Sequence, residues 1–482
     1  MTIGSERDRA AAVPAQGGSA SPAEMPATEL LARYASGALS PVEAVESVLA
    51  RIDRENPALN AFCQVWADEA RAAAKASAER WRRGEPAGPL DGVPVSIKDI
   101  MLTEGRPTLR GSATVDPDRE WPEDSPVVSR LREAGSVFTG KTTTPEIAWK
   151  GVTDSPLTGV TRNPWDLSAT PGGSSGGASA AVAAGMGPLA TGTDGGGSVR
   201  IPASFTGVFA LKPTWGLVPH YPASAFGSLA HSGPITRTVA DAALMMDVIT
   251  GPDPRDWGAL APPAAPFSAA LGDRGVRGLR IAYSPALWGL EVDPEVAAAV
   301  ETAVAAFTEL GAEVERADPP LSDCRQDFHV LWFSGAAKAM ENVPEERRHL
   351  IDPGLREIIA EGLTYSAQDY LTATATRMAL GERMGRFHRE YDLLLTPTMP
   401  ITAFEAGREV PPDWPDPRWT SWAGFSYPFN MTSQPAASVP CGFSSAGLPI
   451  GLQIVGPRHS DALVLAAAHA FEQARPWAHI RP

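Results

Sequence analysis

Hydrophobic positions recur with a helical period in the first part of the chain. Between about Ala27 and Arg83, apolar residues lie three and four positions apart, the spacing that places them on one face of a helix. Ser40 and Pro41 supply an N-cap and a first helical turn within this region. The preceding residues, 1–26, lack an apolar pattern and are expected to be disordered. The sequence therefore predicts a helical N-terminal layer.

Short apolar runs of the kind that form buried strands follow this layer. They are Val93–Lys98, Ser136–Thr139, Leu279–Tyr283, Ala436–Pro440 and Pro449–Val455. Helical patterns lie between and after them, at Pro126–Ala134, Pro294–Leu310 and Asp461–Gln473. This alternation predicts an α/β fold, in which helices cover a β-sheet.

The segment from about 260 to 422 differs in composition from the rest of the chain. It loses the glycine-rich character of the preceding region and contains a loop rich in proline and tryptophan, residues 411–419. The aromatic residues in and beside its second half are Phe328, Trp332, Phe333, Trp414, Trp419, Trp422, Phe425 and Tyr427. About half of them are expected to pack in the core and the others to line an apolar pocket. We interpret 260–422 as a helical insertion over the functional site, within a single domain formed by residues 27–482.

Composition and charge narrow the function classes. Hydrophobic residues make up 43% of the 482 residues, so the chain can bury a large core. The formal net charge of -15 disfavours nucleic acid and anionic membranes as partners. Cys63, Cys324 and Cys441 lie outside the spacings typical of disulfide frameworks and zinc sites, so no metal is expected. Because the sequence has neither an apolar leader nor a run of about 18 apolar residues, we expect a cytoplasmic protein.

The most informative stretch for chemistry is Thr170–Pro202. Two clusters rich in glycine and serine, Gly172–Gly177 and Gly195–Ser198, flank an alanine-rich segment that favours a helix. A flexible linker is one interpretation, but the helix-forming residues between the clusters argue against it. The pattern also lacks the GxxxxGK[ST] motif of phosphate-binding loops and the GxSxG motif of a nucleophile elbow.

Three glycines directly before a serine have a chemical use. The backbone N–H groups of Gly195, Gly196, Gly197 and Ser198 can converge on one point and stabilise a developing oxyanion. Ser198 could then attack a carbonyl carbon, provided that a base removes its proton. Lys98 is a candidate base, because it ends an apolar run in which desolvation disfavours the charged form of a lysine.

Other interpretations of the base remain open on the residue pattern alone. His220 and His231 are the histidines nearest to Ser198 in the sequence, so a Ser-His-Asp arrangement is conceivable but has no local support. Lys98 could also be a solvated lysine or pair with the adjacent Asp99.

Several ordered motifs together closely resemble the amidase signature family. The main ones are Gly92–Asp99 (GVPVSIKD), Pro171–Gly177 (PGGSSGG) and Gly192–Pro202 (GTDGGGSVRIP). Supporting matches are Gly233–Asp241, Leu393–Pro400 and Gly447–Gln453. The resemblance covers the chain from about residue 27 to 472, and the order and spacing of the motifs argue strongly against chance. It implies a large mixed β-sheet core flanked by helices on both faces, and a hydrolase of amide-type bonds.

The resemblance also implies roles for single residues. It makes Ser198 the nucleophile, Ser174 the bridging serine and Lys98 the base, with the two serines 24 positions apart. It implies a cis peptide bond before Ser174 and a reaction without a metal or organic cofactor. The residues that it places in support of this site are Gly173, Ser175, Asp194 and Arg200. An ordinary ion pair explains Asp194 and Arg200 at least as well as direct catalysis does.

The resemblance leaves the substrate open, because aryl or alkyl amides, carbamates (urethanes) and esters share the same acyl chemistry. We expect an acylamidase that prefers a neutral, partly aromatic small molecule, given the aromatic-rich segment and the acidic net charge. The alternative is a glutaminase subunit of a tRNA-dependent amidotransferase, which would have the same catalytic motifs. Assembly into a homodimer is left open.

Overall fold

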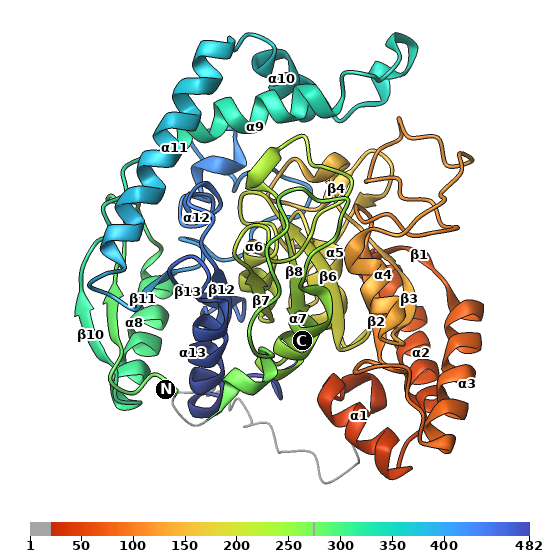
Figure 1. Cartoon of the computed structure of the whole chain (residues 1–482). Helices are drawn as coiled ribbons and strands as arrows, with labels where there is room; N and C mark the ends of the chain where they lie inside the picture. The colour runs from red at the N-terminus through yellow and green to blue at the C-terminus, as the bar shows by residue number, and fades with distance from the viewer. Residues whose placement is uncertain (1–20, 273–274) are drawn as a thin grey trace, which may run out of the picture.

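A computed structural model describes residues 21–272 and 275–482 and contains an eleven-stranded sheet (Figure 1). The strand order is β1-β3-β2-β6-β8-β7-β12-β13-β11-β9-β10. Their bounds are β1 Phe62–Val65, β2 Pro94–Lys98, β3 Val137–Thr142, β6 Leu189–Asp194, β7 Phe209–Lys212, β8 His231–Thr236, β9 Arg280–Tyr283, β10 Glu313–Arg316, β11 Leu393–Pro397, β12 Ala436–Phe443 and β13 Pro449–Val455. A separate hairpin pairs β4 (Asp154–Ser155) with β5 (Gly159–Val160).

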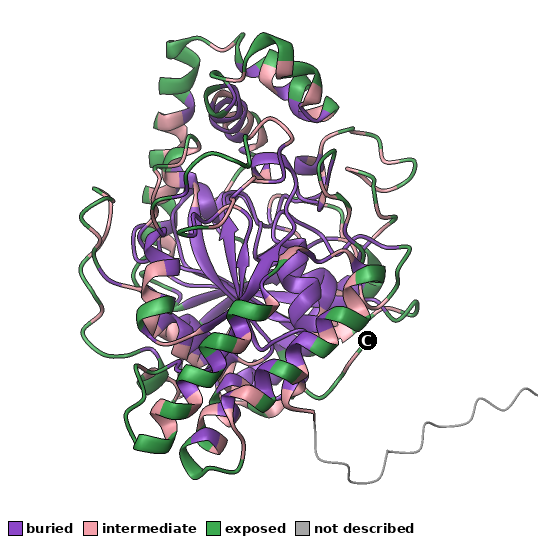
Figure 2. Cartoon of the chain, turned by 90° about the vertical axis from the view of Figure 1, so that its right-hand side faces the viewer, coloured by how far each residue is buried: buried purple, intermediate pink, exposed green. Residues whose placement is uncertain are grey.

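The sheet is mixed, which confirms the predicted fold class. Strand β2 runs parallel to both of its neighbours, β3 and β6, whereas β8, β7, β12 and β13 continue the sheet in antiparallel pairs. Parallel pairing returns where β9 lies between β11 and β10. Buried residues fill the middle of the sheet, whereas its edge strand β10 is mostly exposed. Exposed residues also lie on the outer sides of the surrounding helices (Figure 2).

Thirteen α-helices surround the sheet in the described ranges (Figure 1). They are α1 Ala27–Ser36, α2 Pro41–Leu59, α3 Ala67–Arg83, α4 Pro126–Glu133, α5 Gly176–Ala183, α6 Arg200–Thr206, α7 Val239–Ile249, α8 Pro294–Glu309, α9 Arg325–Ala339, α10 Pro353–Gly362, α11 Ala367–Phe387, α12 Pro428–Met431 and α13 Asp461–Ala474. None of the described helices is both long and apolar enough to span a lipid bilayer.

The predicted N-terminal helices are present as α1, α2 and α3. Ser40 caps α2 by accepting from the backbone N–H of Glu43, whose side chain in turn accepts from the Ser40 backbone N–H. The expected disordered segment is wrong for residues 21–26, where a 3-10 helix, Pro22–Glu24, lies against the core and Ala23 is buried. Residues 1–20 of that segment lie outside the described residues.

The interpretation of 260–422 as a helical insertion also needs correction. Helices α9, α10 and α11 do lie together at one end of the molecule, but the same segment contributes strands β9, β10 and β11 to the main sheet (Figure 1). The short apolar run Leu393–Pro397 is buried along its whole length, as a central strand requires. The sheet therefore extends through this segment instead of ending before it.

Candidate active site

The candidate catalytic residues lie at one edge of the sheet because β2 and β6 are parallel neighbours. Val95 and Ser96 pair with Leu189 and Ala190, so the carboxyl ends of both strands meet at the same edge. Lys98 ends β2, and Thr193 and Asp194 end β6. Two short helices begin beside this edge: Ser174 and Ser175 precede α5, and Ser198 precedes α6. The Gly173–Ser174 peptide bond is cis, as the resemblance implies.

Lys98 is fully buried and has only hydroxyl groups as side-chain partners among the described residues. Its Nζ lies 2.8 Å from Ser174 Oγ, 2.8 Å from Ser175 Oγ and 2.9 Å from Thr193 Oγ1. Burial lowers the pKa of Lys98 well below that of a free lysine, although the charge of Asp194 opposes this shift. The solvated-lysine interpretation is therefore wrong.

Asp99 does not pair with Lys98 either. Its carboxylate accepts from the backbone N–H groups of Leu109 and Gly111, and its nearest cation is Lys141, at 3.9 Å. Alternation along the strand explains this, because adjacent side chains point to opposite faces of the sheet.

Ser198 and Ser174 both line one cavity, and both are buried. Their Oγ atoms form no direct hydrogen bond with each other in the described structure, so the bridging role of Ser174 stays a prediction. Neither His220 nor His231 forms a hydrogen bond with either serine within the described ranges. The His231 ring instead lies by the Leu229 carbonyl, at 2.8 Å, and burial lowers the pKa of His231 well below its usual value.

The loop between β6 and α6 is held by the Asp194 carboxylate. Its Oδ1 accepts from the Gly197 N–H at 2.7 Å, and its Oδ2 accepts from the Val199 N–H at 3.2 Å. The expected contribution of Gly197 to an oxyanion hole is thereby contradicted, because its donor is already used. The N–H groups of Gly195, Gly196 and Ser198 form no hydrogen bond with the described residues and remain the candidate donors.

Arg200 and Asp194 form a fully buried ion pair, with two guanidinium nitrogens each 3.0 Å from a carboxylate oxygen. Arg200 also donates to the side chains of Asn430 and Gln453. Asn430 completes the network by donating to Asp194 Oδ1 at 2.8 Å. The Coulombic attraction of Arg200 keeps the Asp194 carboxylate ionised despite burial, with a depressed pKa. This buried network holds the loop between β6 and α6 in place.

Sequence reasoning missed Thr193, Asn430 and Gln453. Gln453 carried a usable signal, because it is the only polar side chain in the apolar strand Pro449–Val455. A polar residue at a buried strand position needs a partner, so a buried network could have been inferred from it. No comparable pattern marks Asn430.

Three residues of the predicted aromatic cluster contact the glycine loop. A Cβ added to Gly195 would lie 2.6 Å from the Trp332 ring, and one added to Gly196 would lie 2.8 Å from Trp419 and 2.9 Å from Phe328. Phe328 and Trp332 stack with ring centroids 5.4 Å apart. These contacts require glycine at both positions.

Of the eight aromatic residues singled out in the sequence, only Trp332 lines the cavity. Phe328, Phe333, Trp419, Trp422, Phe425 and Tyr427 are buried elsewhere in the core, and Trp414 is partly buried against it. The expectation that half of them line a pocket is therefore wrong. The side chains that do not line the cavity pack in the core. The sequence alone does not show which aromatic residue faces the cavity and which faces the core.

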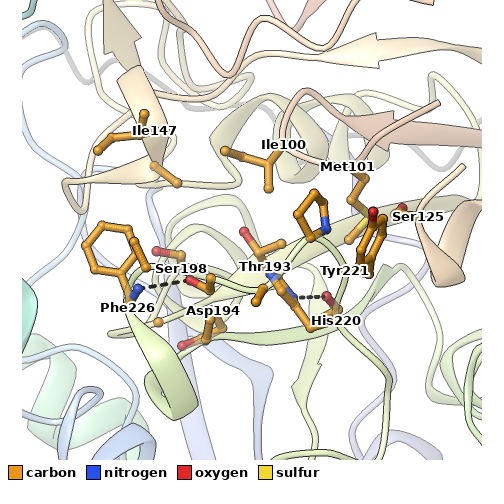
Figure 3. Close-up of a pocket in the computed structure, with 18 of the residues that line it drawn as sticks. Ile100, Met101, Ser125, Ile147, Thr193, Asp194, Ser198, His220, Tyr221 and Phe226 are labelled. Atoms are coloured by element: carbon orange, nitrogen blue, oxygen red, sulfur yellow. Dashed lines mark hydrogen bonds between the residues drawn. The ribbon is translucent and has the colours of Figure 1, made fainter. Parts of the chain in front are cut away.

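The cavity has a volume of about 270 Å³, and its other aromatic rings come from a different segment. Residues 219–226, between β7 and β8, form one wall and contribute Tyr221 and Phe226. Phe226 stacks on Trp332 with centroids 4.0 Å apart. Figure 3 shows Ser198 close to Phe226, with Ile100 and Ile147 on the other side of the pocket.

Comparison with known proteins places this arrangement in a family. The Amidase family profile matches residues 43–465. The chain belongs to the amidase signature family. An acylamidase from Rhodococcus erythropolis is 42% identical over 95% of this chain and 96% of its own length. The glutamyl-tRNA(Gln) amidotransferase A subunit from Chloroflexus aggregans is 37% identical over 93% of this chain and 96% of its own.

Solved structures of amidase signature enzymes share the fold. A bacterial aryl acylamidase superposes with a TM-score of 0.88 at 35% identity, covering 94% of this chain and 97% of that one. A substrate complex of 6-aminohexanoate cyclic dimer hydrolase gives a TM-score of 0.86 at 30% identity, with 95% and 99% covered. This amidase is therefore a hydrolase of amide-type substrates.

Proposed function

We propose that this amidase cleaves its substrate through an acyl-enzyme on Ser198, with Ser174 as proton relay and Lys98 as base. One observation carries the proposal: fully buried Lys98, which has no carboxylate partner among residues 21–272 and 275–482, contacts the Ser174 hydroxyl at 2.8 Å, beside the cavity that Ser198 lines. A lysine in such surroundings favours its neutral form and can accept a proton.

The reaction begins when Ser198 Oγ attacks the amide carbonyl carbon. Its proton passes to Ser174 Oγ as the Ser174 proton passes to Lys98 Nζ, and the carbonyl oxygen becomes an oxyanion held by the N–H groups of Gly195, Gly196 and Ser198. The relay then returns a proton to the leaving nitrogen, and the C–N bond breaks. Water repeats the sequence on the acyl-enzyme, which releases the acid and restores Ser198.

Aryl and alkyl amides are the substrates that we infer, with carbamates and esters as further candidates. A cavity with Ile100, Ile147, Phe226 and Trp332 among its lining residues suits an apolar group on at least one side of the scissile bond. The likeness to the Rhodococcus acylamidase and to the bacterial aryl acylamidase supports the same choice.

The test is a panel of anilides, primary amides, carbamates, esters and free glutamine, assayed with the purified chain alone. We expect an anilide to be hydrolysed and Ser198→Ala to abolish turnover. Mass spectrometry of a quenched and digested reaction should find the acyl group on the peptide that contains Ser198. A strong preference for glutamine would favour the alternative, a glutaminase subunit like the amidotransferase relatives. Undiminished activity in Ser198→Ala would refute the proposed nucleophile.

A further inference from the structure

Arg110 is the only lysine or arginine among the described residues that line the catalytic cavity. Its surroundings there are mostly apolar side chains and hydroxyl groups. The one carboxylate in the lining, Asp194, is already paired with Arg200. The cavity therefore contains a cation whose charge no other lining residue neutralises.

The backbone of the turn at Arg110 is held by hydrogen bonds in a conformation that orients the Arg110 side chain. Arg110 has a φ of 57°, in the left-handed region that non-glycine residues seldom adopt. The Asp99 carboxylate accepts from the backbone N–H groups of Leu109 at 3.1 Å and Gly111 at 3.3 Å, on both sides of Arg110. The Arg110 carbonyl accepts from the Ile147 N–H at 2.7 Å. These bonds hold an unfavourable backbone conformation that directs one side chain.

The Arg110 guanidinium forms no hydrogen bond and no ion pair with the described residues. Burial disfavours the charge of Arg110 and Arg119 repels it, so that its pKa is lowered although Asp99 attracts it. His220 also faces it, with a pKa that burial lowers and that Arg110 lowers further. Arg200 shows the usual alternative, since that buried arginine has a carboxylate and two amide partners. An arginine without such partners at a cavity wall can donate its N–H groups to an acceptor on a bound ligand.

We propose that Arg110 binds a carboxylate on the substrate, so that the amides preferred by this enzyme carry an acid group apart from the scissile bond. This inference rests on the proposed amidase function. A carboxylate fits better than a neutral carbonyl because the guanidinium offers a planar fork of donors and needs charge compensation. The net charge of -15 does not oppose this, because charges beyond about 10 Å are screened by salt whereas Arg110 lies in the cavity wall.

Matched anilide pairs test the proposal on both sides of the amide. N-phenylsuccinamate and butyranilide differ by a carboxylate in the acyl part; para-acetamidobenzoate and para-methylacetanilide differ by one in the leaving part. We measure the ratio of kcat/KM within each pair. For at least one pair the wild type should prefer the carboxylate, and Arg110→Met should lower that ratio by about 10- to 100-fold, mainly through KM. Arg110→Lys, which keeps the charge but loses the fork, should give an intermediate ratio.

Arg119→Met is the control, because it removes one nearby positive charge from an exposed residue outside the cavity lining. Its ratio should stay within about twofold of wild type. An unchanged ratio in Arg110→Met, an equal fall in Arg119→Met, or preference for the neutral member of both pairs overturns the proposal. If no compound is hydrolysed, the inferred preference for anilides fails; calorimetric binding of the two carboxylates, lost in Arg110→Met, then still decides the role of Arg110.

Discussion

Replacing Gly195 with alanine would test whether the aromatic cluster positions the oxyanion loop. The added Cβ would lie 2.6 Å and 2.8 Å from two atoms of the Trp332 ring, whereas ordinary contact begins at 3.4 Å. The loop or the ring must therefore move by about 0.8 Å. Trp332 has little freedom to move, because it stacks between Phe226 and Phe328 and donates from its indole nitrogen to the Trp149 carbonyl at 3.0 Å.

The magnitude follows from that displacement. Overpacking of this kind lowers the free energy of unfolding by about 1–3 kcal/mol. A shift of about 1 Å at a catalytic group lowers kcat/KM by about 100-fold, close to the loss of one oxyanion donor. Gly195→Ala should therefore remain folded but lose about two orders of magnitude in kcat/KM for an anilide. Trp332→Leu in the same chain removes the ring atoms that the Cβ would meet, so the double variant should recover most of that loss.

Kinetics and thermal melting of Gly195→Ala, Trp332→Leu and the double variant measure the coupling. Gly385→Ala is a suitable control, because the added Cβ there meets nothing within 4 Å and lies on helix α11. Wild-type kcat/KM in Gly195→Ala would refute the steric argument. So would a double variant whose losses are simply the sum of the two single losses.

Further predictions concern the base and a buried carboxyl. Lys98→Ala and Ser174→Ala should each lower kcat by at least about 100-fold while the protein stays folded, with more activity left in Ser174→Ala because water can bridge Lys98 and Ser198. Full activity in Lys98→Ala would mean another base. Because burial lowers the pKa of Lys98, kcat/KM should rise with pH to a plateau, with an apparent pKa well below that of free lysine. A pH profile that loses its inflection in His220→Gln would contradict this prediction. Burial raises the pKa of Glu409 from 4.5 to about 7. Ionised Glu409 therefore lowers the free energy of unfolding, with no effect below pH 4.5 and the full effect above about pH 7. Glu409→Gln should thus stabilise the protein by up to about 3 kcal/mol near pH 8 and have little effect near pH 4, as pH-dependent melting would reveal.

The sequence by itself determined the class of fold and the catalytic motifs. Apolar runs such as Pro449–Val455 and capped helices such as Pro41–Leu59 are local patterns, and local patterns report secondary structure. The motifs around Lys98, Ser174 and Ser198 depend on short-range order of residue types, so they are visible without coordinates.

Only the tertiary structure decided which residues meet. Lys98 and Ser174 are 76 positions apart and come within 2.8 Å because β2 lies beside β6. Trp332 lines the cavity, whereas Phe328 and Trp419 contact the glycine loop without reaching the cavity. Long-range packing of α9 makes this difference, and residue type does not. Gly197 looks equivalent to Gly195 and Gly196 in the sequence, yet the Asp194 carboxylate uses its N–H. Nothing in the local sequence distinguishes Arg110 from an ordinary surface arginine, yet the turn held by Asp99 places it in the cavity wall. Contacts between distant segments are not encoded in any local pattern.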